Sequence, residues 1–206
     1  MKHLVGVFAA CGLVCLPAAS AAGNDAARIE AAQALHARGQ GQQAIAKLLP
    51  LAREGNAEAA YLLGRLYYYD EAGVPRDWRM AARWFERAAR AGHAGGQYKL
   101  GGIYYTGRGR RQDVEQAIYW WAKAAVQGHP EALNNLGALV STGTGMTADP
   151  ELGLALQHLA AEQGSEAAQE NVRNKPPSER SEQLAREFSA HPSSLAERIA
   201  KLVEKK

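Results

Sequence analysis

The sequence predicts an all-α protein in which similar helix pairs stack into a solenoid. Alanine is the commonest residue type and glycine contributes 21 of the 206 residues, whereas aromatic residues make up only 7%. Small residues suit closely packed helices, and β-strands favour branched and aromatic residues. Apolar residues also recur at the spacing of a helix face. Above all, a unit of about 36 residues is present three times, which is typical of repeat architectures.

The three repeats occupy residues 56–92, 93–128 and 129–164, and the first copy has one additional residue between Tyr69 and Gly73. Four sets of positions recur in all copies: Leu63-Gly64, Leu100-Gly101 and Leu136-Gly137; Asp77, Asp113 and Asp149; Ala88-Ala89, Ala124-Ala125 and Ala160-Ala161; and the closing Gly92, Gly128 and Gly164.

Each copy is expected to form two helices separated by a turn. In the first helix, Ala60, Leu63 and Tyr67 follow the spacing of a buried stripe. The recurring aspartate is expected to cap the start of the second helix, and the closing glycine to end it in the left-handed conformation. The glycine after each leucine is expected to let the paired helices approach, because a Cβ there would hold them apart. Two helices cannot bury such a stripe alone, so the copies must stack.

Further helices are expected on both sides of the repeats. Residues 23–55 are predicted to form a shorter helix pair. Residues 165–206 are predicted to form a partial repeat followed by capping helices that cover the last apolar face. The closing helices are expected over residues 178–190 and 193–204, and the second is expected to begin with a capping box made by Ser194 and Glu197.

The repeat pattern resembles that of the Sel-one-like repeat (SLR) family, a relative of tetratricopeptide repeats with longer units. It is carried in the first copy by Ala60, Leu63, Gly64, Tyr67, Asp77, Ala81, Trp84, Phe85, Ala88, Ala89 and Gly92. The second copy departs from it at Gln97, and the third at Val140, Gly153, Leu156 and Gln157. Residues 23–55 are more similar to a tetratricopeptide repeat. The resemblance implies a right-handed α-solenoid that binds other proteins and has no catalytic chemistry. It also implies that many periplasmic members act in envelope assembly or bind a secreted toxin.

The N-terminus has the pattern of a secretory signal peptide over residues 1–22. A basic start is followed by an apolar run from Leu4 to Leu16 and then by small residues. The run is too short for a permanent membrane-spanning helix, so no integral membrane segment is expected after cleavage near Ala21-Ala22. Both cysteines lie inside this leader, in surroundings that fit lipid attachment less well than soluble export. We therefore expect a periplasmic protein without disulfides.

Neither a catalytic constellation nor a metal site is predicted. Two histidines, His93 and His129, share one repeat position, and the others have no second His or Cys at metal-ligand spacing. Glycine-rich nucleotide loops and the nucleophile elbow of hydrolases are missing from the sequence. The net charge of +3 is too small for a dedicated nucleic-acid binder. The expected partner is therefore another protein, with no cofactor, metal or nucleic acid.

Arginines gather on the second helix of the first repeat and in the next turn. They are Arg76, Arg79, Arg83, Arg87 and Arg90, then Arg108, Arg110 and Arg111. One interpretation is a basic patch for an acidic partner, an anionic lipid or a polysaccharide. The favoured interpretation is a solvated outer face whose charge is partly neutralised by Asp77 and Glu86.

Thirteen of the fifteen aromatic residues lie between Tyr61 and Trp121. The repeat pattern assigns some of them to the core: Tyr67, Trp84, Phe85, Tyr104, Trp120 and Trp121. Beside this stripe, a flank of the first helices is predicted to line a concave partner-binding groove, because Tyr and Arg dominate binding hot spots. The candidates are Tyr61, Arg65, Tyr68, Tyr69, Tyr98, Tyr105, Asn134 and Ser141. The alternative is that neighbouring helices stack over these tyrosines.

The sequence therefore favours a periplasmic protein-binding solenoid without catalysis. The most specific hypothesis is an immunity protein that binds and neutralises an antibacterial effector, such as a lipase delivered by a type VI system. The second is a scaffold in envelope or exopolysaccharide assembly. A cell-envelope hydrolase is the remote alternative, and it would need His158 beside an acid and a serine in one cleft.

Overall fold

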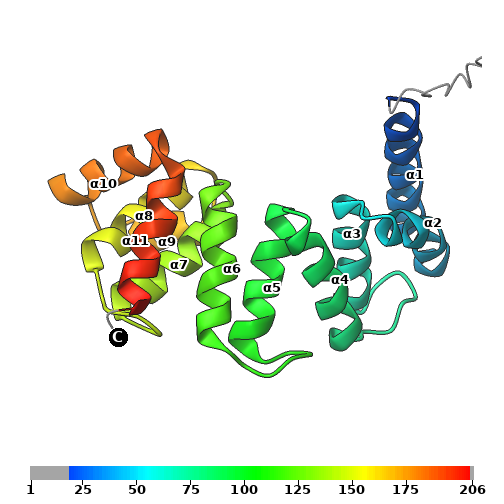
Figure 1. The fold of residues 1–206 in the computed structure, drawn as a ribbon, viewed down its shortest axis with the longest axis horizontal. Coiled ribbons are helices and arrows are strands. Elements are labelled where there is room, and N and C mark those ends of the chain that lie inside the picture. Colours follow the sequence, from blue (N-terminus) through cyan, green and yellow to red (C-terminus); the bar gives the residue numbers. More distant parts are fainter. Residues whose placement is uncertain (1–18, 205–206) are drawn as a thin grey trace, which may run out of the picture.

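The computed structural model describes residues 19–204, and in that range the chain forms eleven α-helices and no strand (Figure 1). The prediction of an all-α fold is confirmed. The helices are α1 (Ala19–Ala37), α2 (Gly41–Arg53), α3 (Ala57–Tyr68), α4 (Trp78–Arg90), α5 (Ala94–Thr106), α6 (Val114–Val126), α7 (Pro130–Thr142), α8 (Pro150–Glu162), α9 (Glu166–Val172), α10 (Glu179–Ala190) and α11 (Pro192–Glu204).

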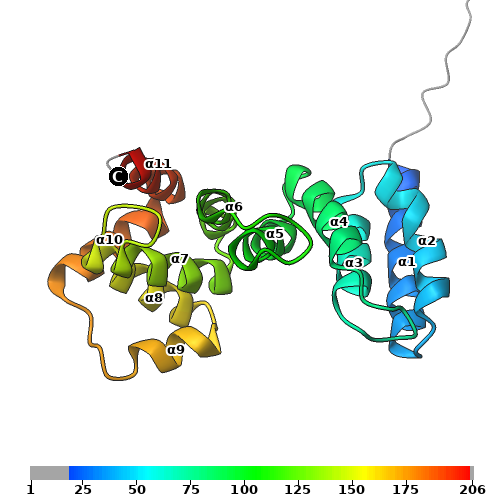
Figure 2. The same cartoon turned by 90° about the horizontal axis from the view of Figure 1, so that it is seen from below.

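Helices α3 to α8 form three helical hairpins that coincide with the three repeats. In each hairpin the first helix packs on the second, and the second packs on the first helix of the following hairpin. The α1–α2 pair precedes this array and continues the same stacking (Figures 1 and 2). The predicted solenoid is therefore confirmed, and the two helix positions of each unit line two different sides of it.

The recurring glycine brings the two helices of each hairpin into close contact. A Cβ added to Gly64 would lie 2.6 Å from the ring of Phe85, and one added to Gly101 would lie 2.5 Å from the ring of Trp121. At Gly137 the obstacle is the backbone oxygen of Gly153, at 2.8 Å. These distances are too short for real carbon contacts, so only glycine permits this spacing of the helices.

The predicted helix caps are present. The side chain of Asp77 accepts hydrogen bonds from the backbone N–H groups of Arg79 and Met80, both at 2.9 Å, and Asp113 and Asp149 cap α6 and α8 in the same way. Because these bonds satisfy otherwise unpaired helix N–H groups, each aspartate fixes where its helix begins. The closing glycines have φ angles of +91°, +78° and +93°, as a left-handed helix end requires.

The longer turn of the first repeat is attached to the N-terminal helix pair. The backbone N–H of Gly41, at the start of α2, donates a hydrogen bond of 2.8 Å to the carbonyl oxygen of Ala72. A Cβ on Gly41 would lie 2.5 Å from that oxygen and from the buried side chain of Val74. The additional residue of this repeat therefore belongs to a turn that holds α2 in place.

The two predicted closing helices are present as α10 and α11. Helix α10 packs on α8 and α11 packs on α6 (Figure 1), so the cap covers the side of the array formed by the second helices. The predicted capping box at Ser194 was wrong. Helix α11 already begins at Pro192, and the Ser194 hydroxyl donates to the carbonyl oxygen of His191. A capping box is present instead at the start of α10, between Ser178 and Ser181.

The predicted leader falls almost entirely outside the described residues, because the described part of the chain starts at residue 19. Helix α1 begins there, so the predicted cleavage position near Ala21-Ala22 lies in its first turn. Within residues 19–204, none of the helices combines the length and the apolar character needed to cross a membrane.

Candidate functional site

A lysine surrounded by three tyrosines lies where the first repeat meets the second. The ammonium nitrogen of Lys99 lies 5.6 Å from the ring centroid of Tyr68, 5.3 Å from that of Tyr69 and 5.4 Å from that of Tyr98. It also donates a hydrogen bond of 2.7 Å to the hydroxyl of Tyr69. We call these four residues the tyrosine–lysine cluster. Aromatic faces attract a cation, so the rings hold the ammonium group in place.

The electrostatics of the cluster keep this lysine charged. Burial works to lower the pKa of Lys99, but the hydrogen bond with Tyr69 and the other neighbouring hydroxyls outweigh it and raise the pKa above its usual value. At Tyr98, by contrast, burial raises the pKa of the hydroxyl group. Among residues 24–204, Lys99 has no ion pair with a carboxylate.

Tyr61 and Tyr98 each stack on the histidine at the N-cap position of the first helix of the following repeat. The ring centroids of Tyr61 and His93 are 4.4 Å apart, and those of Tyr98 and His129 are 4.6 Å apart. Both tyrosines are half-buried. Tyr61 also lies against the ring of Phe85, and both tyrosines remain partly exposed, which agrees in part with the interpretation that neighbouring helices stack over the flank tyrosines.

His93 also links the two helices through hydrogen bonds. Its Nδ1 accepts from the backbone N–H of Gly96 at 3.1 Å, which leaves the proton on Nε2, and Nε2 lies 2.8 Å from a carboxylate oxygen of Glu58. The hydrogen bond from His93 lowers the pKa of Glu58. His93 and His129 are thus the N-cap residues of α5 and α7, in agreement with their predicted role as repeat positions.

The other predicted groove residues differ in accessibility. Arg65 lies 6.0 Å from the ring of Tyr61, and Tyr105 is 38% exposed with its ring against Trp121. Asn134 is buried beneath a neighbouring helix, which argues against its predicted place in the groove, whereas Ser141 is half-buried. Asn134 is only 8% exposed and its amide oxygen accepts from Asn171 of α9, whereas the hydroxyl of Ser141 packs against α8.

These differences share one physical cause. The flank position occupied by Tyr61, Tyr98 and Asn134 faces the first helix of the next unit. Tyr61 and Tyr98 are too large to be covered completely, but the short side chain of Asn134 is buried beneath α9. Lys99 was not predicted. Its repeat equivalents, Leu62 and Asn135, are uncharged, so the change to a cation beside Tyr98 could have indicated a role for this position.

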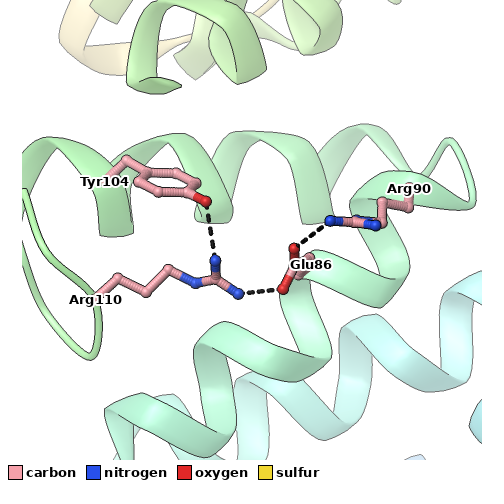
Figure 3. A network of polar contacts seen from close by, with 4 residues as sticks. All are labelled: Glu86, Arg90, Tyr104 and Arg110. Carbon is pink, nitrogen blue, oxygen red and sulfur yellow. Dashed lines mark hydrogen bonds and ion pairs between the residues drawn. The ribbon is translucent and has the colours of Figure 1, made fainter. Parts of the chain in front are cut away.

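The arginines of the predicted basic patch have different surroundings. The guanidinium groups of Arg76 and Arg108 lie 5.5 Å and 5.3 Å from the ring of Trp78, which is 37% exposed. Arg79, Arg83 and Arg111 are exposed. Arg110 is held internally, because it bonds to Glu86 and to the hydroxyl of Tyr104 at 2.9 Å (Figure 3). Two acids were predicted to neutralise part of the arginine charge. Asp77 accepts hydrogen bonds from backbone N–H groups, whereas Glu86 pairs with Arg90 and Arg110.

The remaining candidates for chemistry have structural partners. His158 lies 3.0 Å from the carbonyl oxygen of Lys175, and His36 lies 3.7 Å from Glu71. Within the described residues there is no group of three His, Cys, Asp or Glu side chains that could hold a metal ion.

Comparison with protein families gives a match over the repeats. The profile described as Sel1 repeat matches residues 57–93, 94–129 and 130–165, which together make up just over half of the chain. Each match begins at the first residue of one of the hairpins α3–α4, α5–α6 and α7–α8 and ends three residues after its second helix.

Similar proteins have the same architecture. A Sel1 repeat protein from Oxalobacter formigenes is 32% identical with a TM-score of 0.57, and the match covers 63% of this chain and 97% of that one. A protective antigen from uropathogenic Escherichia coli strains, which displays an SLR fold, is 22% identical with a TM-score of 0.53, over 89% of this chain and 49% of that one. At that identity the likeness concerns the fold alone.

One curated relative is much longer than this chain. The ERAD-associated E3 ubiquitin-protein ligase component HRD3A of Arabidopsis thaliana is 40% identical over 58 residues. These residues are 28% of this chain and only 9% of that protein. The chain therefore matches a small part of this relative.

Proposed function

This chain belongs to the Sel1 repeat family, and on that premise we propose that it is an exported protein that binds a partner protein through the tyrosine–lysine cluster. Solenoids of this family are typically non-catalytic scaffolds for protein binding. The observation that carries the proposal is the charged Lys99 between three tyrosine rings, without a carboxylate partner among the described residues.

The cluster has the properties of a binding hot spot. Tyrosine rings provide a large contact area with little conformational freedom to lose, and hot spots are enriched in such residues. The hydrogen bond to Tyr69 and the flanking rings fix the position of Lys99 before binding, which reduces the entropy cost of association. A partner carboxylate, from a side chain or from a chain terminus, is the complementary group.

For the biological role we propose a periplasmic immunity protein that binds and neutralises an antibacterial effector, such as a type VI-delivered lipase. Two observations support it: the leader pattern of residues 1–22, and the fixed position of the charged Lys99 among three tyrosine rings. A scaffold in envelope or exopolysaccharide assembly is the second candidate. It is favoured by the relative HRD3A, whose name describes it as a component of an E3 ubiquitin-protein ligase.

Affinity capture with matched lysine variants tests the binding surface. The tagged protein is expressed with its leader, and captured periplasmic proteins are identified by mass spectrometry. Lys99→Met is expected to lower the yield of the specific partner by about tenfold, because a charged contact in a hot spot is lost. Lys123→Met is the control, since Lys123 also lies over two aromatic rings, Tyr119 at 4.8 Å and Trp120 at 5.5 Å, but on α6.

The same experiment separates the two biological roles. An immunity protein is expected to capture a toxin-like effector and to protect cells that express this effector in the periplasm. A scaffold is expected to capture envelope-assembly components and to give no protection. Equal capture by the wild type and by Lys99→Met would exclude the tyrosine–lysine cluster as the binding surface.

A further inference from the structure

The second helices of the solenoid are separated by three equivalent grooves, one between α2 and α4, one between α4 and α6, and one between α6 and α8. The floor of each groove comes from the intervening first helix, and the equivalent floor residues are Leu63, Leu100 and Leu136. The grooves share one backbone plan, so differences between them arise from side chains.

The α6/α8 groove is covered by the C-terminal helices of the same chain, which leave a pocket of about 340 Å³ beneath them. Helix α11 packs on α6 through Leu195 and Ile199, and α10 packs on α8 through Leu184 and Phe188. All four side chains are buried. Amphipathic helices therefore pack against both walls of this groove in the protein itself.

The α4/α6 groove is closed by its own side chains. Arg110 reaches across it to Glu86 of α4 and to the hydroxyl of Tyr104 on α5 (Figure 3). Glu86 also bonds to Arg90 at 2.7 Å. The Arg110 guanidinium also lies 5.4 Å from the centre of the Tyr104 ring, so charged side chains cover this part of the groove.

The α2/α4 groove is open, with a volume of about 860 Å³. Its lining includes the apolar side chains of Leu49, Met80 and Trp84, and the guanidinium group of Arg87 lies 5.2 Å from the centre of the Trp84 ring. At its rim lie four arginines and one acid: Arg53, Arg83, Arg87, Arg90 and Glu86. Glu86 is already bonded to Arg90 and Arg110, and within the described residues Arg53, Arg83 and Arg87 have no ion pair. The rim therefore carries a strong positive charge above an apolar floor.

We propose that the α2/α4 groove is a docking site for an acidic amphipathic helix of a partner protein. The occupant presents an apolar stripe to the floor, as α11 does with Leu195, Ile199 and Leu202, and places Asp or Glu residues against the arginine rim. The occupant is expected to be acidic because arginines of α4 stand where the covered groove has apolar wall residues. Leu152, Ala155 and Leu159 of α8 correspond to Met80, Arg83 and Arg87 of α4.

This groove shares no residue with the tyrosine–lysine cluster, so the inference does not depend on the proposed function. Helix-in-groove recognition uses apolar anchors three and four residues apart, and charge complementarity at the rim selects the partner. Acidic helices are thus accepted and basic helices are repelled.

Two synthetic helical peptides test the proposal by fluorescence anisotropy with the whole protein. Both carry an apolar stripe with the spacing of Leu195, Ile199 and Leu202; one has glutamates and the other lysines at the flanking positions. We expect saturable binding of the acidic peptide, accompanied by a change in tryptophan fluorescence at Trp84, and binding of the basic peptide that is at least about tenfold weaker.

Charge reversal locates the site. Arg83→Glu with Arg87→Glu is expected to abolish binding of the acidic peptide and to permit binding of the basic one. Arg173→Glu with Arg186→Glu, at exposed arginines of α9 and α10, is the control and is expected to bind as the wild type. Circular dichroism verifies that each variant is folded.

A second variant copies the closed groove. Leu49 is half-buried and occupies the position of Glu86, so Leu49→Glu adds one negative charge to the rim and is expected to weaken binding of the acidic peptide by about tenfold. Equal binding of both peptides to the wild type, or unchanged binding of the acidic peptide to either groove variant, overturns the proposal. It is also overturned by a concentration-dependent dimer in sedimentation that the arginine reversal abolishes, because the occupant is then a second copy of this chain.

Discussion

The equivalent grooves at the two ends of the repeat array differ, because one is covered by the chain itself and the other is open. Between α6 and α8 the walls are apolar, with Ala122 on one side and Leu152 and Leu159 on the other, and the C-terminal helices cover them. Between α2 and α4 the equivalent positions are Leu49, Met80 and Arg87, and the groove is open. The helix scaffold is common to both, so a few side chains decide whether a groove is closed by its own chain or offered to a partner.

The largest effect is expected from a cavity in the covered groove. Phe188 is 4% exposed and packs in the cluster that joins α8 and α10, so Phe188→Ala is expected to lower the free energy of unfolding by about 3–5 kcal/mol. Met80→Ala, in the open groove, is expected to cost about 1 kcal/mol, because that side chain is only partly buried. Urea denaturation measures both, and similar losses would contradict the distinction between the grooves.

A smaller effect is expected from a feature that all repeats share. Gly101→Ala would place a Cβ 2.5 Å from the Trp121 ring and is expected to destabilise the protein by about 1–3 kcal/mol. Gly102 has no atom within 4 Å of such a Cβ, so Gly102→Ala is expected to leave stability unchanged or to raise it by up to about 1 kcal/mol. Thermal unfolding of the two neighbouring variants compares them directly. A loss of stability in both would mean that helix packing is not what requires glycine at position 101.

The closed middle groove can be made to resemble the open one. Glu86→Leu introduces the residue found at the equivalent position of α2 and removes the partner of Arg110. The expected loss is about 1 kcal/mol in the free energy of unfolding, the usual value of a partly exposed charged hydrogen bond. The variant is also expected to become less sensitive to salt in thermal denaturation. Arg90→Ala, which removes only the exposed partner of Glu86, is expected to have less effect.

The smallest effect concerns pH. Burial lowers the pKa of His129, with Glu131 acting in the opposite direction and Lys99 and His93 adding to the decrease. The folded state therefore resists protonation, so stability is constant above the unfolded pKa of about 6.5 and falls as the pH drops below it. His129→Asn, which installs the cap residue found at Asn56, is expected to flatten this dependence between about pH 7 and pH 5. His191→Asn at the end of α10 is the control, and an unchanged slope in His129→Asn would contradict the prediction.

The fold could be predicted because repeated positions report on packing. Residues such as Gly64 and Asp77 recur, and each recurrence corresponds to one contact or one cap in the structure. The position of the closing helices could not be predicted in the same way, since they contact the second helices and not the end of the last hairpin. The signal was present in the departures of the third repeat, where Leu156 and its neighbours give α8 an apolar outer face.

The candidate site was predicted less completely than the fold. The tyrosines of the first two repeats were identified from their helical spacing, but spacing does not report which side chains the next helix covers. Asn134 is covered by α9 for that reason. Lys99 was missed because it lies outside the expected stripe, and its association with Tyr69 depends on a contact across the two repeats.

The C-terminal helices also fix where the array can be lengthened during evolution or by design. Because α10 rests on α8 and α11 rests on α6, the cap requires the last two hairpins in their present order. A repeat added after Gly164 would have no place without displacing the cap. A repeat inserted before α5 leaves the cap and its two supporting hairpins intact, so this solenoid can grow from the interior and not from its C-terminal end.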